Sequence, residues 1–181
     1  VAESEKISAL LMKNNYEVSI YSGGEGNEEA FRSLSGSNSP AIIHLATHGF
    51  FFPNPKSPLQ EGKVVNDVNI SRSLFKNDIN PMFRSGIVLA GANNIWKSGN
   101  KIEGVEDGIL TAYEVSDMNL LNTDLTILSA CESGLGDIRG DEGVFGLQRS
   151  FKIAGVKNII VSLWKVPDKE TSELMELFYT Y

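Results

Sequence analysis

The spacing of apolar residues along this chain predicts several helices. Ile7 and Leu11 recur at the interval of one helix face, and Leu174, Leu177 and Phe178 do the same near the C-terminus. We expect the second set to face inward, against the core. The pattern predicts helices over residues 4–14, 27–34, 109–115, 144–154 and from 168 onward.

Short apolar runs rich in β-branched residues lie between these helices. The run at 41–47 is nearly continuous, as in a strand that is buried on both faces of a parallel sheet. Similar runs predict strands at 86–90, 125–130 and 156–163, and an alternating stretch predicts another at 17–21. Strands that alternate with helices indicate an α/β fold with a mainly parallel sheet.

Two long stretches without periodicity interrupt this pattern. The first covers residues 50–84, contains four prolines and includes a weakly alternating segment at 63–71 that predicts a hairpin. The second covers residues 93–107. Because such stretches in compact domains are usually lids or binding loops, we expect them to border a groove.

The composition of the chain argues against two kinds of partner, nucleic acids and membranes. The 16 Lys and Arg residues and 23 Asp and Glu residues give a net charge of −7, without a basic stripe. Nucleic acid is therefore not an expected partner, because phosphate contacts dominate that affinity. No apolar run approaches the roughly 20 residues of a membrane span, and we expect no membrane association.

The chain length indicates how many domains to expect, and the single cysteine indicates the cellular location. The 181 residues suit one domain, and both ends fall within helical patterns without capping signals, so we expect a single domain over 1–181 cut from a longer chain. Residues 1–16 mix charges and do not resemble a secretory signal. Because Cys131 has no partner for an intrachain disulfide, we expect a reducing, cytoplasmic location.

Polar residues gather where the predicted strands end, which is where α/β sheets bind ligands. His48 and Cys131 each follow an apolar run and have a glycine close behind. An imidazole can accept the thiol proton and later protonate a leaving amine. The backbone amides of Gly49 and Cys131 are our candidates for an oxyanion hole. Taken alone, this pattern also fits a small buried cysteine and a hydrogen-bonded histidine.

Several segments in order extend this pattern. These segments are HLATHGFF at 44–51, RSGIVLAGAN at 84–93, EDGILTAYE at 106–114, LSACESGLG at 128–136, and GVFGLQR at 143–149 through SLWKV at 162–166. With these motifs in this order, the chain resembles the CHAT family over about residues 15–181, and the caspase-like domains of that family are usually attached to TPR repeats.

The resemblance implies a caspase–hemoglobinase fold, an α/β three-layer sandwich around a mainly parallel central sheet. It also implies a dyad of His48 and Cys131 that cleaves a protein or peptide substrate without a cofactor. A TPR or other regulatory region is then expected elsewhere in the longer chain. The rival interpretation is a catalytically silent caspase-like module that serves only for interaction or regulation.

The residues around the dyad give a weaker indication of the substrate. Ser129 and Trp164 are candidates to line its pocket, although Trp164 is equally suited to the core. Asp137 and Asp168 are further candidates, and an acidic pocket would select a basic side chain. Asp168 is at least as well suited to cap the last helix.

Metal binding is not expected. His44 and His48 would share a helix face, but on a strand they lie roughly 13 Å apart. We therefore interpret His44 as a buried, hydrogen-bonded structural residue. The acidic residues Asp137, Asp141 and Glu142 offer oxygens that calcium prefers, but we interpret them as a solvated loop.

Overall fold

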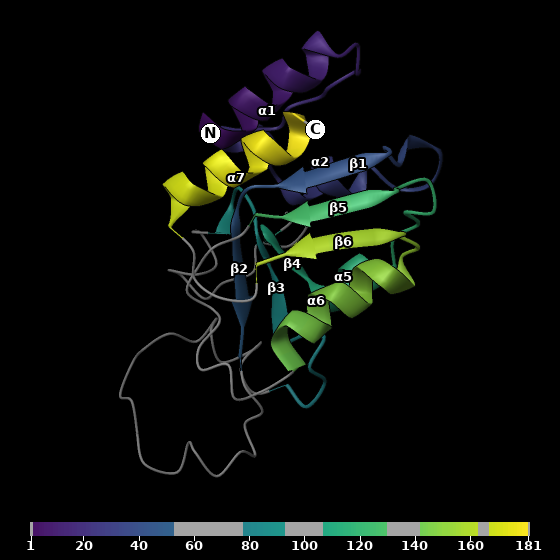
Figure 1. The fold of residues 1–181 in the computed structure, drawn as a ribbon. Coiled ribbons are helices and arrows are strands. Elements are labelled where there is room, and N and C mark those ends of the chain that lie inside the picture. The colour runs from purple at the N-terminus through teal and green to yellow at the C-terminus, as the bar shows by residue number, and fades with distance from the viewer. Residues whose placement is uncertain (1, 53–77, 93–106, 130–141, 163–166, 181) are drawn as a thin grey trace.

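A computed structural model describes residues 2–52, 78–92, 107–129, 142–162 and 167–180. The hairpin predicted at 63–71 and most of both long loops lie outside these residues. The described part of the chain is mixed α/β, with one parallel and one antiparallel sheet of three strands each (Figure 1).

The parallel sheet consists of β1 (Ile42–Leu45), β5 (Leu125–Leu128) and β6 (Asn158–Val161), in the order β1-β5-β6. Its register pairs Leu45 with Leu128, and Leu128 with Val161. Three of the predicted strands are therefore confirmed in position and direction, although each is shorter than its apolar run. In Figure 1 the three arrows point to the same edge of the sheet.

The antiparallel sheet consists of β2 (His48–Phe51), β3 (Ser85–Val88) and β4 (Ile109–Thr111), in the order β2-β3-β4. The expectation that the run at 86–90 joins the parallel sheet is therefore wrong. An apolar run shows that a strand is buried but does not encode the direction of its neighbours. The chain leaves the parallel sheet at the end of β1 and, after two intervening residues, enters the antiparallel sheet at β2.

Two further sequence predictions need correction. Residues 17–21 belong to no helix or strand, and Ile20 and Tyr21 are exposed, so the alternation there reflects no paired strand. The helix predicted at 109–115 begins only at α5 (Ala112–Ser116), after β4. Thr111 and Glu114 form a capping box, in which each side chain accepts a hydrogen bond from the other residue's backbone amide, and this fixes where α5 begins.

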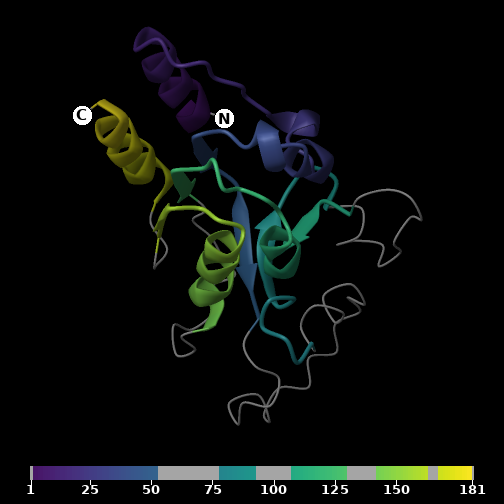
Figure 2. The same cartoon turned by 90° about the vertical axis from the view of Figure 1, so that its right-hand side faces the viewer.

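Helices α1 (Ala2–Lys13) and α7 (Asp168–Thr180) pack side by side on one face of the parallel sheet (Figures 1 and 2). Ile7 of α1 and Met175 of α7 are buried there with Ile127 of β5. The two elements furthest apart in the chain thus share one apolar cluster, and both predicted helices are confirmed.

The other face of the parallel sheet is covered by α2 (Glu28–Arg32), α5 and α6 (Glu142–Ile153). The main core lies between this face and the antiparallel sheet, so it joins both sheets. Phe151 of α6 is completely buried within it. Its fully or largely buried members are Phe31, Ile43, Ile87, Leu110, Val115, Met118, Leu120, Leu128, Phe151, Ala154 and Val156.

The predicted inner face of the last helix is wrong. Leu174 and Leu177 are 59% and 57% exposed, and Phe178 is also exposed. Thr171 and Met175 are buried instead, because α7 turns that side to the sheet. Two faces of α7 carry apolar groups at helical intervals, and periodicity alone did not distinguish them.

Helix α6 approaches β3 at a glycine. A Cβ atom added to Gly146 would lie 2.3 Å from the Ser85 Oγ and 3.2 Å from the Ser85 Cβ. Gly146→Ala should gain helix propensity, yet we expect it to lower the free energy of unfolding by about 1–3 kcal/mol because the interface is overfilled. Urea denaturation measures the change. In the Ser85→Ala background the same substitution should cost less, and an equal cost would contradict this explanation.

Candidate active site

The carboxyl ends of β1 and β5 lie side by side. Their last residues, Leu45 and Leu128, are paired in parallel register, and the Ser129 amide donates a hydrogen bond to the Leu45 carbonyl at 3.0 Å. The two strands therefore end at the same edge of the sheet, close to where β2 begins (Figure 1).

His48 is the first residue of β2 and is exposed. It pairs with Val88 across the antiparallel ladder, and the hydroxyl of the preceding Thr47 donates a hydrogen bond to the Val88 carbonyl. The backbone at the start of β2 is thus held at two points. No other described residue forms a hydrogen bond with the His48 ring, which leaves both ring nitrogens open to a group from outside this part of the chain.

The Gly49 amide points away from β3. The Phe52 amide donates to the Arg84 carbonyl at 2.8 Å, which marks that pair as hydrogen-bonded. Antiparallel pairs alternate, so the pair formed by Gly49 and Ile87 is of the non-bonded kind. Since β2 is an edge strand of the sheet that the described residues form, the amide faces away from that sheet.

On the face of the parallel sheet that α1 and α7 cover, a series of hydrogen bonds links four side chains, those of Glu3, Ser129, His44 and Tyr179. One oxygen of the Glu3 carboxylate, on α1, lies 2.6 Å from the Ser129 Oγ and 3.0 Å from the His44 Nε2. The His44 Nδ1 lies 3.1 Å from the hydroxyl of Tyr179, on α7. The His44 side chain is only 12% exposed, which confirms the prediction of a largely buried, hydrogen-bonded strand residue.

The donor of each hydrogen bond of His44 can be assigned. A carboxylate only accepts, so the His44 Nε2–H donates to Glu3; in the neutral ring Nδ1 then accepts from the Tyr179 hydroxyl. Burial and the nearby Glu3 charge raise the pKa of Tyr179 to about 12, which keeps that hydroxyl protonated. Burial raises the pKa of Glu3, but the hydrogen bonds from His44 and Ser129 outweigh it, and the net pKa is lowered.

The lowered pKa of Glu3 predicts an acid-sensitive contribution to stability. A carboxylate whose pKa is lower in the folded state stabilises the fold above its unfolded value, about 4.3, and loses this effect as the pH falls through the folded value. We expect Glu3→Gln to lower the free energy of unfolding at pH 7 by about 1.5–3 kcal/mol. The difference from wild type should shrink in denaturation series taken below pH 4.

The matched control is Glu5→Gln, which makes the same chemical change at an exposed position of the same helix. Its free energy of unfolding should follow wild type at every pH. A Glu3→Gln deficit that persists unchanged at pH 3 would contradict the assignment to the ionised carboxylate.

Most of the other predicted site residues lie outside the described part of the chain. These are Cys131, Asp137, Asp141 and Trp164. Asp168 is the first residue of α7, so the N-cap position before the helix belongs to Pro167 and not to Asp168. Glu142 is the first residue of α6, so the expectation that it lies in a loop is wrong. Sequence reasoning missed Glu3 and Tyr179, because no local pattern links them to His44.

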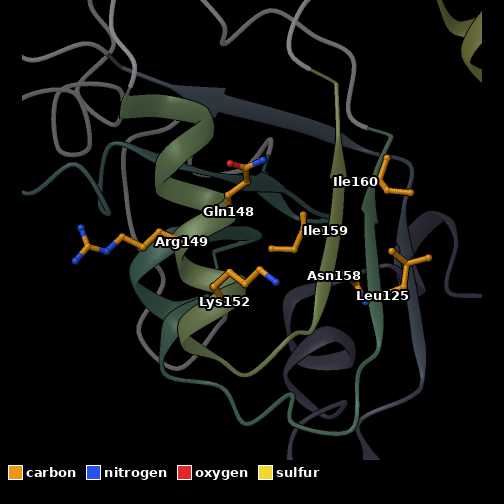
Figure 3. Close-up of a pocket in the computed structure, with 7 residues that line it drawn as sticks. All are labelled: Leu125, Gln148, Arg149, Lys152, Asn158, Ile159 and Ile160. Carbon is orange, nitrogen blue, oxygen red and sulfur yellow. The ribbon is translucent and has the colours of Figure 1, made fainter.

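A shallow hollow is found at the outer edge of the parallel sheet, between α6 and β6 (Figure 3). Ile159 packs with the core on one face of the sheet and Ile160 with the cluster on the other, so the hollow wraps around the edge strand and is open. It shares no residue with the predicted site. Its lining residues are Leu125, Gln148, Arg149, Lys152, Asn158, Ile159 and Ile160.

Comparison with models of protein families matches residues 1–181 to one described as the CHAT domain. Neither a curated protein nor a solved structure gives a significant match. Among the helices that the structure describes, none has the length and apolar character needed to cross a bilayer.

Proposed function

Since the chain belongs to the CHAT domain family, we propose that it is a caspase-like cysteine endopeptidase whose dyad is His48 and Cys131. The observation that carries the proposal is the parallel pairing of Leu45 with Leu128. His48 and Cys131 each follow one of these residues by three positions. Neighbouring strands lie about 4.8 Å apart, and three residues span at most about 11 Å, so both side chains can reach one site.

In the proposed reaction the Cys131 thiolate attacks the carbonyl carbon of the scissile peptide bond. His48 stabilises the thiolate and protonates the leaving amine, and water then releases the acyl group from the sulfur. The accessible ring of His48 supports this role, because a proton must pass between it and the substrate. No cofactor takes part in these steps.

The negative charge on the substrate oxygen needs hydrogen-bond donors as it develops. We assign this role to the amides of Gly49 and Cys131. The alternation of the β2–β3 ladder supports the first assignment, because it leaves the Gly49 amide on the open edge of the strand. A donor held by a strand is preorganised, which is where such stabilisation is most effective.

The proposal extends to the fold, a caspase-like three-layer sandwich. Helices on both faces of the parallel β1-β5-β6 sheet support it. The second sheet, β2-β3-β4, then lies at the edge where the dyad is expected.

The proposed substrate is a protein or peptide with a basic side chain before the scissile bond. Asp137 and Asp168 would supply the acidic character of the pocket, with Ser129 and Trp164 in its lining. We further propose a cytoplasmic location and control by a TPR or other regulatory region. The alternative is a silent interaction module with the same fold.

The test is covalent labelling of the full-length protein with acyloxymethyl-ketone peptides that end in Arg, Leu or Asp. We expect one label per chain, fastest with the Arg probe, and none in Cys131→Ala with an unchanged circular dichroism spectrum. Faster labelling by the Asp probe would overturn only the proposed specificity. No labelling by any probe, with and without partner proteins, would favour the silent module.

A further inference from the structure

The Glu3 carboxylate lies between the two strands that lead to the proposed dyad. A single oxygen accepts hydrogen bonds from Ser129 and from His44. Ser129 stands two positions before Cys131, and His44 stands four positions before His48. Glu3 itself comes from neither sheet, because it belongs to α1.

The two contacts differ from ordinary surface pairs. The Glu3 and His44 side chains are 14% and 12% exposed, so little water competes for the shared oxygen. Charge-assisted hydrogen bonds of this kind are short and directional. The Ser129 Oγ contact, at 2.6 Å, lies within the range of a charge-assisted hydrogen bond from a hydroxyl to a carboxylate.

Ser129 also takes part in a backbone hydrogen bond between the two segments, the last one among the described residues. The Ser129 amide donates to the Leu45 carbonyl, one position after the final register pair. Glu3 therefore ties the side chain of Ser129 to β1 through His44, on top of the backbone bond. Tyr179 extends the tie to α7.

From this geometry we infer that Glu3 is a positioning residue. Its carboxylate fixes the ends of β1 and β5 relative to one another, so that docking of α1 on the sheet sets the separation of His48 and Cys131. The inference rests on the proposed endopeptidase activity. It also gives Ser129 a second role, because its hydroxyl is held by Glu3 and is oriented to the α1 side.

The first test compares steady-state hydrolysis by full-length wild type, Glu3→Gln, Ser129→Ala and the control Glu5→Gln, at a temperature where all are folded. A misplacement of reacting groups of about 1 Å costs about 100-fold in rate. We expect kcat to fall about 10–100-fold in the first two variants with KM unchanged, and no change in Glu5→Gln. Wild-type kcat in Glu3→Gln would overturn the inference.

The double variant Glu3→Gln/Ser129→Ala separates positioning from general weakening. If both residues act through one contact, kcat in the double variant should be no lower than in the worse single variant. Multiplicative losses would overturn the inference. A raised KM at wild-type kcat in Ser129→Ala would also overturn it, and would favour a residue that only lines the substrate pocket.

A readout without turnover keeps this inference separate from the proposed function. If the wild type hydrolyses nothing, the endopeptidase proposal fails, and the tie is judged by hydrogen exchange at the Ser129 amide. Exchange in Glu3→Gln relative to Glu5→Gln that is accelerated more at Ser129 than at the buried Ile127 amide, which reports global unfolding, supports the tie. Equal exchange at Ser129 in both variants overturns it.

Discussion

Replacing His48 with glutamine is expected to lower kcat for peptide hydrolysis by about 100- to 10,000-fold. Glutamine keeps a hydrogen-bonding side chain of similar length but cannot exchange a proton with the thiol or the leaving amine. Because His48 is exposed and makes no hydrogen bond to another described side chain, the fold should not depend on its ring. Steady-state kinetics of the full-length protein measure the effect.

Two controls test whether a loss of activity comes from the missing imidazole. The free energy of unfolding of His48→Gln should equal that of wild type, which excludes loss of activity through loss of folded protein. Glu5→Gln should retain wild-type kcat, since Glu5 lies exposed on α1. A His48→Gln variant that hydrolyses peptides at the wild-type rate would show that another group handles the proton.

Replacing Phe151 with alanine is expected to lower the free energy of unfolding by about 3–5 kcal/mol. The ring has 0% exposure and lies in the core that joins the two sheets. Its removal costs the transfer of the aromatic group and also leaves a cavity. Because domains of this size are stable by only about 5–15 kcal/mol, urea denaturation should show a large shift of the midpoint.

The matched control is Phe178→Ala on α7. Phe178 is 43% exposed, so the same truncation should change the free energy of unfolding by less than about 1 kcal/mol. Equal losses at the two positions would contradict the assignment of the buried face of α7 to Thr171 and Met175. The pair thus tests the one helix face that the sequence pattern misidentified.

Local sequence signals predicted most elements because helix and strand periodicity reflect burial. Asn27 was expected to begin a helix, and its side chain accepts a hydrogen bond from the Ala30 amide as the N-cap of α2. The partner of a strand is not a local property, so the antiparallel setting of β3 was not predictable. Nor was β2, because its residues Phe50 and Phe51 were assigned to the loop at 50–84 and its first two residues to no element.

Those features of the candidate site that depend on neighbouring residues could be predicted from the sequence. Contacts between residues far apart in the sequence could not. His44 was expected to be a hydrogen-bonded strand residue, since β-branched neighbours exclude the helical zinc geometry. Its partners Glu3 and Tyr179 stand 41 and 135 positions away, and only the packing of α1 and α7 brings them near. Polar contacts of that range leave no periodic signature in a single sequence.

The change of sheet between β1 and β2 has a mechanical consequence. His48 and Gly49 move with one sheet, whereas the strand that leads to the thiol belongs to the other. The separation of the proposed acid and nucleophile would then depend, besides the Glu3 contacts, on how the two sheets pack against each other through side chains such as Ile87 and Leu128. A small tilt between them would alter the geometry of the proposed dyad while leaving the described strand ladders intact, so we expect that the proposed activity can be lost without unfolding of the domain.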